Sequence, residues 1–303
     1  MKHLLLIGAQ KAGSTFLYSL LRQHPRILAA VPKEPMFFSK PCNDSTEYDV
    51  LYSHYTNHHY DYFLDASASY LHVAGTAERA FKLLNNETRI ICIVRDPISR
   101  IRSSFKHELK HGRELRQYQS IFPASADTIE TLHAAEESLL KASYLDGIIQ
   151  PHYSPKYRYR DQLFQFRYIY NSCYMMQLSS WASLFPRIMI IHFDYLVTNP
   201  TSTLSSLASW LELDEYSFDL NKNSSNSTRL SISKSFAKSI LLKRDHKKYI
   251  NPLQIFSLLR NSYRSLGQPY SINNYLSELA IHELQSQFYQ CFQRFQSIGW
   301  NPL

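Results

Sequence analysis

The feature that most constrains the fold is an apolar run near the start of the chain that breaks into a glycine loop. The run from Leu4 to Ile7 is four adjacent aliphatic residues, a pattern typical of a strand buried on both faces of a sheet. Gly8 and Gly13 follow, and the apolar residues from Phe16 to Leu21 recur at helical spacing. This predicts a strand, a loop and a helix. The helix N-terminus favours an anion, because its first N–H groups have no partner within the helix.

The details of the loop narrow the kind of anion. Gly8 and Gly13 have the separation of the glycines in a Walker A loop, but Ser14 stands where that loop carries its lysine. The lysine lies inside the loop instead, as Lys11. Because the lysine that a Walker A loop needs is missing at Ser14, a nucleoside triphosphate site is disfavoured. Taken alone, the loop is equally well explained as an ordinary strand-to-helix turn with a solvated lysine.

Three further apolar runs predict strands, over 27–31, 89–94 and 188–193. Helical patterns predict helices over 76–84, 127–140, 168–184, 204–211 and 276–295. Because strands alternate with helices, we expect an α/β fold with a P-loop-like parallel sheet flanked by helices, in a single domain over residues 1–303. The 44% of hydrophobic residues is enough to fill a sizeable core.

A glutamate follows the second predicted strand, in the run Pro32-Lys33-Glu34-Pro35. Ligands of such a sheet bind beyond the carboxyl ends of its strands, so Glu34 is expected at the same edge as the glycine loop. A carboxylate there repels a polyanion, which favours a catalytic role. The alternative is a surface glutamate between two prolines.

The third predicted strand ends at Arg95-Asp96-Pro97. Asp96 is a good N-cap and Pro97 suits the first helical position, so Arg95 is expected at the strand end. Ser103 lies about two turns along the predicted helix. A planar guanidinium with a hydroxyl suits a phosphate monoester. The alternative is a capped helix with a basic exposed side.

Charge and cysteine content limit the class of protein. The net charge of +8 and the pI near 9.2 favour an anionic partner, whether nucleotide, sulfated or phosphorylated ligand, nucleic acid or lipid. The four cysteines form no C-x-x-C pair, so buried thiols are expected and no metal site. We recognise no signal sequence and no membrane-spanning run, and expect a cytoplasmic protein.

Two stretches are rich in aromatic residues. From Tyr48 to Phe63 tyrosines and histidines are crowded, which predicts an aromatic acceptor pocket or lid, with loop packing as the alternative. From Tyr144 to Tyr170 tyrosines are interleaved with arginines. That pattern can bind a single-stranded nucleic acid, but a substrate-side or surface segment is favoured.

Together these motifs resemble the sulfotransferases that use 3′-phosphoadenosine 5′-phosphosulfate (PAPS), in the branch that includes heparan-sulfate sulfotransferases and many bacterial relatives. The likeness covers nearly the whole chain. The residues that match the family's 5′-phosphosulfate loop are Lys11, Ala12, Gly13, Ser14 and Thr15.

The resemblance assigns further residues to the PAPS site. It identifies Arg95 and Ser103 as the 3′-phosphate site. It also identifies Glu34 as the catalytic glutamate, because 33–38 is similar to the segment that supplies this residue in the family. Arg229 is assigned to the cofactor because 226–229 loosely matches the family's late phosphate-binding loop. One departure stands out: many heparan-type members carry a lysine where this chain has Ala66.

The implied reaction moves a sulfuryl group from PAPS to a hydroxyl or amine of an acceptor. Glu34 is the expected general base and Lys11 meets the developing charge, while His107 is a weaker candidate base. An intracellular small-molecule acceptor is favoured, and a carbohydrate is the alternative. We expect no metal and no nucleic-acid partner. The rival hypotheses are an ATP-dependent small-molecule kinase and a noncatalytic protein that binds RNA or glycans.

Overall fold

The computed structural model describes residues 2–41, 44–55, 59–122, 128–149, 163–221, 257–262, 264 and 276–299. Contacts divide the chain into two compact units. The first contains 1–96, 174–226 and 287–303, and the second contains 97–173 and 227–286. The single domain expected from the sequence stays a prediction.

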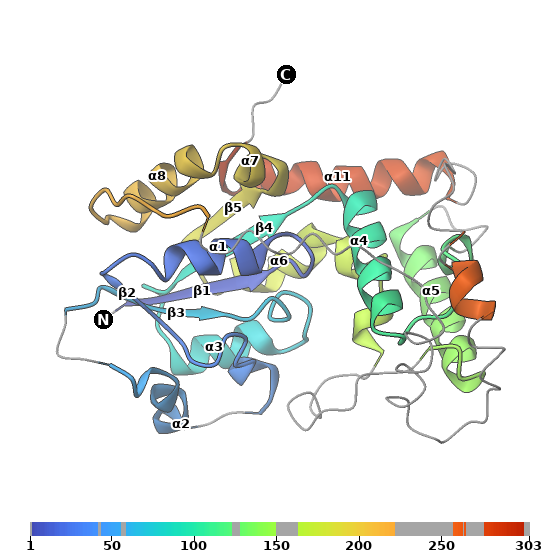
Figure 1. Ribbon diagram of the computed structural model, residues 1–303, viewed down its shortest axis with the longest axis horizontal. Helices are drawn as coiled ribbons and strands as arrows, with labels where there is room; N and C mark the ends of the chain where they lie inside the picture. Colours follow the sequence, from blue (N-terminus) through green and yellow to red (C-terminus); the bar gives the residue numbers. More distant parts are fainter. Residues whose placement is uncertain are drawn as a thin grey trace. The chain divides into compact units, whose positions relative to one another are not determined.

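The first unit is built on a six-stranded sheet with the order β2-β3-β1-β4-β5-β6 (Figure 1). All neighbouring strands are parallel. The strands are β1 (Lys2–Gly8), β2 (Ile27–Ala29), β3 (Tyr62–Ala66), β4 (Arg89–Val94), β5 (Ile188–His192) and β6 (Gln296–Ile298). The parallel sheet flanked by helices that the sequence predicts is confirmed.

Helices cover both faces of this sheet. Figure 1 shows α3 on one side and α1 with α8 on the other. Because both faces are covered, the run from Leu4 to Ile7 in β1 is fully buried. The helices of this unit are α1 (Ser14–Leu21), α2 (Ser45–Asp49), α3 (Thr76–Leu83), α6 (Tyr174–Ala182), α7 (Phe193–Thr198), α8 (Pro200–Leu211) and the last part of α11 (Glu278–Arg294).

Four predicted strands are confirmed as β1, β2, β4 and β5, while β3 and β6 were not predicted. β3 was missed because a buried aspartate, Asp65, interrupts its apolar pattern and because it continues a tyrosine-rich stretch. It lies between β2 and β1. Glu34 and the glycine loop therefore follow strands that are two positions apart in the sheet.

Three tyrosines of the stretch 48–63 pack in the core, while Tyr55 is exposed. Tyr48, Tyr52 and Tyr62 are 1–3% exposed. The Tyr48 ring contacts the rings of Phe37 and Phe38. For these buried tyrosines the expected acceptor pocket or lid is wrong, and packing is the correct alternative.

The second unit is mainly helical. It contains α4 (Pro97–Lys110), α5 (Ile129–Leu145) and the first part of α11, around an apolar core of its own. The helix predicted over 168–184 begins late, at Tyr174. The amides of Ile169 and Tyr170 donate instead to the buried carboxylate of Glu136, at 2.7 and 2.9 Å, which stabilises a short turn there.

The other predicted helices are confirmed as α3, α5, α8 and α11. Short 3₁₀ turns lie over Phe37–Ser39, Val50–Tyr52, Gln119–Ile121, Phe164–Phe166 and Tyr170–Ser172. The thiols of Cys92, Cys173 and Cys291 are buried and free, as expected.

Candidate active site

The glycine loop joins β1 to the N-terminus of α1, as its sequence predicts. The Ala12 N–H donates to the Ala9 carbonyl at 3.1 Å, which closes the turn, and the Ala9 N–H donates to Ile93 of β4 at 2.7 Å. Lys11 and Gly13 have φ of 69° and 91°, the left-handed region. The first turn of α1 carries no acidic residue, so the helix N-terminus keeps its preference for an anion.

Gly13 is favoured by its left-handed backbone and also lies close to a neighbouring ring. A Cβ added there would lie 3.1 Å from two ring carbons of Phe193, the first residue of α7. Phe193 follows β5, so its ring reaches the loop from the end of another parallel strand. The loop therefore lies directly against α7.

Arg95 follows β4 and contacts the same loop. Its Nη1 donates to the Lys11 carbonyl oxygen at 3.3 Å, and its guanidinium carbon lies 4.3 Å from the centre of the Phe193 ring. The Arg95 carbonyl accepts a hydrogen bond from the Tyr174 hydroxyl at 2.8 Å. These contacts fix both the backbone and the side chain of Arg95 beside the loop.

Arg95 has further N–H donors besides the one that contacts the Lys11 carbonyl. Its Nε is buried and has no hydrogen-bond partner among the described residues. A buried donor without a partner is costly, and a guanidinium is suited to phosphate oxygens. Because β1 and β4 are neighbours, their ends lie about 5 Å apart. The loop and Arg95 can therefore hold two phosphate groups of one ligand.

Glu34 lies after β2 in the same unit and is half-buried. Its Oε1 accepts from Lys33 Nζ at 2.9 Å. The Lys33 ammonium lies 5.6 Å from the centre of the Tyr18 ring on α1, and the Tyr18 hydroxyl donates to the Ala30 carbonyl at 3.2 Å. The carboxylate is thus linked through Lys33 to the helix that carries the anion loop.

Ser103 and His107 lie on α4 in the second unit. Both side chains are half-buried, and the His107 ring lies 4.4 Å from the ring of His111. The pairing of Ser103 with Arg95 and the role of His107 as a base stay predictions. In the same helix Arg100 is buried and donates to Ser172 Oγ at 2.7 Å, a structural role.

Several predicted features lie outside the described residues. They are Arg229, the loop 226–229 and the tyrosine-arginine run 156–160. The lysine found in many heparan-type members is replaced by Ala66, which is buried at the end of β3. Among the described residues, no group of three His, Cys, Asp or Glu side chains could hold a metal ion, and no helix is long and apolar enough to cross a membrane.

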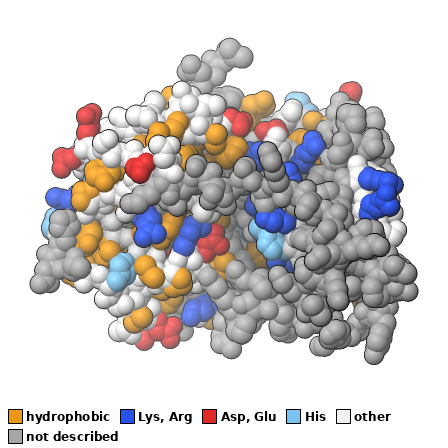
Figure 2. All heavy atoms as spheres, in the orientation of Figure 1, with side chains coloured by type: hydrophobic (Ala, Val, Ile, Leu, Met, Phe, Trp, Pro, Cys, Tyr) orange, Lys and Arg blue, Asp and Glu red, His pale blue; other side chains and the backbone are white. Residues whose placement is uncertain are grey.

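The described part of the molecular surface carries charges of both signs. On the face drawn in Figure 2, described Lys and Arg side chains lie in separate groups beside apolar or acidic side chains. The described part of this face therefore does not show the continuous basic stripe that nonspecific nucleic-acid binders present.

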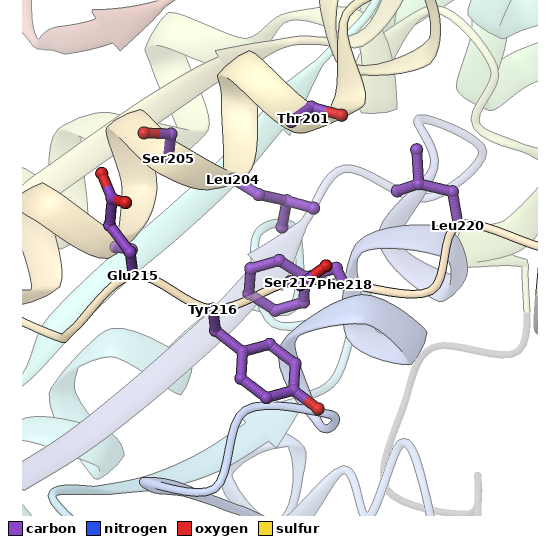
Figure 3. Close-up of a pocket in the computed structure, with 9 residues that line it drawn as sticks. Thr201, Leu204, Ser205, Glu215, Tyr216, Ser217, Phe218 and Leu220 are labelled. Carbon is purple, nitrogen blue, oxygen red and sulfur yellow. The ribbon is translucent and has the colours of Figure 1, made fainter.

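A cavity of about 520 Å³ lies elsewhere in the first unit, between α8 and the segment that follows it (Figure 3). In that segment, the backbone carbonyls of Asp214 and Asp219 accept hydrogen bonds from the side chains of His24 and Gln23. These two residues lie just beyond the C-terminal end of α1. The cavity is thus near the end of α1 opposite the anion loop. None of the predicted site residues lines it. The lining residues are Thr201, Leu204, Ser205, Ala208, Glu215, Tyr216, Ser217, Phe218 and Leu220.

Sequence reasoning missed Phe193 as a site residue. Its position as the last residue of the strand predicted over 188–193 was the available signal. It also missed Ser67 and Tyr70, whose hydroxyls accept hydrogen bonds from the segment that carries Glu34, and Asp65, which accepts from both hydroxyls. Those hydrogen bonds join residues about 30 positions apart in the chain.

Known proteins resemble this chain over most of its length. The profile of the family described as "Sulfotransferase domain" matches residues 1–252. The membrane-associated sulfotransferase kil1 of Dictyostelium discoideum is 22% identical over 271 residues, which cover 72% of this chain and 57% of kil1. The human bifunctional heparan sulfate N-deacetylase/N-sulfotransferase 2 is 22% identical over 225 residues, 70% of this chain and 22% of that protein.

These relatives are longer than the present chain, which spans about half of the first and a fifth of the second. The solved structure of a sulfotransferase from Alicyclobacillus acidocaldarius has the same fold. It matches with a TM-score of 0.56 and 17% identity, over 88% of this chain and 99% of that one.

Proposed function

The chain belongs to the sulfotransferase domain family, and from that premise we propose that it transfers a sulfuryl group from PAPS to a hydroxyl or amine of an acceptor. The observation that carries this proposal is the contact of Arg95 with the Lys11 carbonyl. It brings a guanidinium beside a helix N-terminus, at neighbouring strand ends. Two adjacent anion sites suit a 3′,5′-bisphosphate better than a single triphosphate chain.

The residues present fit PAPS. The loop from Lys11 to Thr15 offers a lysine, two hydroxyls and the N–H groups of a helix start to the 5′-phosphosulfate. The Arg95 guanidinium offers its remaining N–H donors to the 3′-phosphate. We propose that Ser103 and Arg229 add to the 3′-phosphate site.

The chain's own residues then have distinct roles. When bound, PAPS supplies the sulfuryl group, whose bond to a phosphate oxygen breaks as its bond to the acceptor forms. Glu34 takes the proton that the acceptor loses, an effect typically worth about 10²- to 10⁴-fold in rate. Because Lys33 donates to Oε1, we assign the proton to Oε2. Lys11 neutralises the charge that develops as the phosphate leaves.

The sequence favours, as the acceptor, an intracellular small molecule that carries a hydroxyl or an amine. The names of the heparan sulfate N-sulfotransferases among the relatives support the alternative, a carbohydrate acceptor. The cytoplasmic location expected from the sequence also stays a prediction.

The test is a transfer assay with ³⁵S-labelled PAPS and a metabolite extract of the host, followed by mass spectrometry. We expect label in a product that has gained one sulfuryl group. Lys11→Ala should abolish transfer, while Lys40→Ala, a partly exposed lysine paired with Glu47, should retain it. A protein that shows no saturable binding of 3′,5′-bisphosphoadenosine by calorimetry does not have the proposed function.

Two further measurements separate the rival hypotheses. A kinase would transfer label from γ-³²P-ATP with a magnesium requirement. A noncatalytic binder of RNA or glycans would show affinity that falls steeply with salt and does not depend on Lys11.

A further inference from the structure

The segment that carries Glu34 has an unusual backbone. Glu34 and Met36 both have φ of 54°, the left-handed region that favours glycine, and Pro35 lies between them. Residues other than glycine keep this conformation only where the surrounding structure holds them. The contacts of this segment therefore determine where the Glu34 carboxylate lies.

Two buried hydroxyls hold the backbone of the segment. The Met36 N–H donates to Ser67 Oγ at 3.0 Å. The Phe38 N–H donates to the Tyr70 hydroxyl oxygen at 3.3 Å. Ser67 and Tyr70 follow β3, the strand next to β2, and neither side chain is exposed to solvent. The loop after one strand thus anchors the loop after its neighbour.

Asp65 fixes the direction of these hydrogen bonds. The Ser67 hydroxyl donates to its Oδ1 at 2.9 Å and the Tyr70 hydroxyl donates to its Oδ2 at 2.7 Å. An ionised carboxylate can only accept hydrogen bonds. Both hydroxyl protons are therefore committed to Asp65, and the hydroxyl oxygens are left to accept from the backbone. Burial and the charge of Asp65 raise the pKa of Tyr70 well above its usual value, which keeps this donor protonated.

The far end of the segment is held as well. The Phe38 side chain is fully buried between the rings of Tyr48 and Tyr70. Arg79 Nε donates to the Phe38 carbonyl at 2.6 Å. The backbone is therefore fixed from Met36 onward, and Glu34 extends from this fixed point.

We propose that Asp65, Ser67 and Tyr70 are positioning residues that hold the Glu34 carboxylate in place for proton transfer. The proposal rests on the proposed function, in which Glu34 is the general base. The three residues act through the amides of Met36 and Phe38 and do not touch the acceptor. Asp65 is the central residue, because its two carboxyl oxygens accept from both hydroxyls.

The sharpest test compares two buried tyrosines. Tyr70→Phe removes the hydroxyl between Asp65 and the Phe38 amide. Tyr62→Phe is the matched control, since the hydroxyl of Tyr62 is also buried and donates to a carbonyl, that of Leu211 at 2.9 Å. We expect Tyr70→Phe to lower kcat by about 10- to 100-fold, because small misplacements of a catalytic group cost this much. The Kd for 3′,5′-bisphosphoadenosine should stay within twofold of wild type.

A second pair of variants separates positioning from a general loss of stability. Ser67→Ala should lower kcat in the same way, and Ser67→Thr, which keeps a hydroxyl, should restore most of it. Hydrogen exchange supplies a readout that does not depend on activity. The amides of Met36 and Phe38 should exchange faster in Tyr70→Phe and Ser67→Ala, and at the wild-type rate in Tyr62→Phe.

The outcomes are distinct. Unchanged exchange at both amides in the Tyr70→Phe/Ser67→Ala double variant overturns the network itself. Faster exchange with unchanged kcat overturns its role in catalysis. A wild-type protein that transfers no sulfuryl group overturns the proposed function and with it the catalytic role, while the exchange comparison still decides whether the hydroxyls hold the segment.

Discussion

Arg95 Nη1 donates a hydrogen bond to the carbonyl oxygen of Lys11 at 3.3 Å. This contact joins the ends of β4 and β1, so the two predicted anion-binding motifs, 84 positions apart in the sequence, are in direct contact. Phe193 packs against both of them, since its ring lies beneath the guanidinium and against Gly13. A change in the loop, in Arg95 or in Phe193 is therefore expected to alter binding of the same ligand.

Replacement of Arg95 should weaken binding of the nucleotide. Arg95→Ala removes charge-assisted hydrogen bonds worth about 1.5–3 kcal/mol, which corresponds to an increase in the Kd of about 10- to 100-fold. Titration calorimetry with 3′,5′-bisphosphoadenosine measures the Kd of the variant and of wild type. Arg187→Ala, a surface arginine paired with Glu87, is the control and should bind as wild type. Equal Kd values for Arg95→Ala and wild type would exclude Arg95 from the site.

Loss of the Phe193 ring should weaken binding more modestly. A stacked cation–π contact is worth about 0.5–2 kcal/mol, so Phe193→Leu should raise the Kd by about 2- to 30-fold. Trp210→Leu is a matched control, because Trp210 stacks on Arg89 with 5.2 Å between guanidinium carbon and ring centre, away from the anion loop. If both variants weaken binding equally, the effect is one of stability and the assignment of Phe193 is wrong.

Glu34→Gln should separate binding from chemistry. The amide keeps the size of the side chain but cannot take the acceptor proton, so kcat should fall by about 10²- to 10⁴-fold. The Kd for 3′,5′-bisphosphoadenosine should not rise, since no negative charge is added near the anion. Single-turnover transfer assays with calorimetry measure both quantities. Retention of wild-type turnover would assign the base to another residue, with His107 as the next candidate to replace.

Glu136 should make stability depend on pH. Burial raises its pKa from 4.5 to about 7, although the amides of Ile169 and Tyr170 oppose the shift. Between these values the folded protein binds more protons than the unfolded chain. Its contribution to the free energy of unfolding is therefore greatest below about pH 4.5 and is lost as the pH rises to about 7. Over this pH range, the contribution of Glu136 to the free energy of unfolding changes by about 3 kcal/mol.

The measurement is the melting temperature of wild type and Glu136→Gln across this pH range. The neutral amide does not titrate, so the melting temperature of the variant minus that of wild type should increase from pH 4.5 to pH 7. A difference that is constant with pH would show that Glu136 has an ordinary pKa in the folded protein.

Local features of the sequence were sufficient for the central elements. The four aliphatic residues before Gly8 predict β1, and the loop with Lys11 and Gly13 predicts the start of α1, because strand burial and helix starts depend on adjacent residues. The run before Arg95 and the proline after it likewise predict β4 and α4. The membership of the sulfotransferase domain family agrees with these motifs.

The tertiary structure decided what joins these elements. β3 escaped prediction because its buried Asp65 accepts hydrogen bonds from the Ser67 and Tyr70 hydroxyls, whose oxygens in turn accept from the backbone of a segment about 30 residues earlier. The contacts of Arg95 with Lys11 and Phe193 likewise depend on the order β1-β4-β5 in the sheet. The sequence by itself determined which strand ends carry charged and polar groups. Only the pairing of strands distant in the chain determined which of those ends are neighbours, because hydrogen bonds between strands set that order.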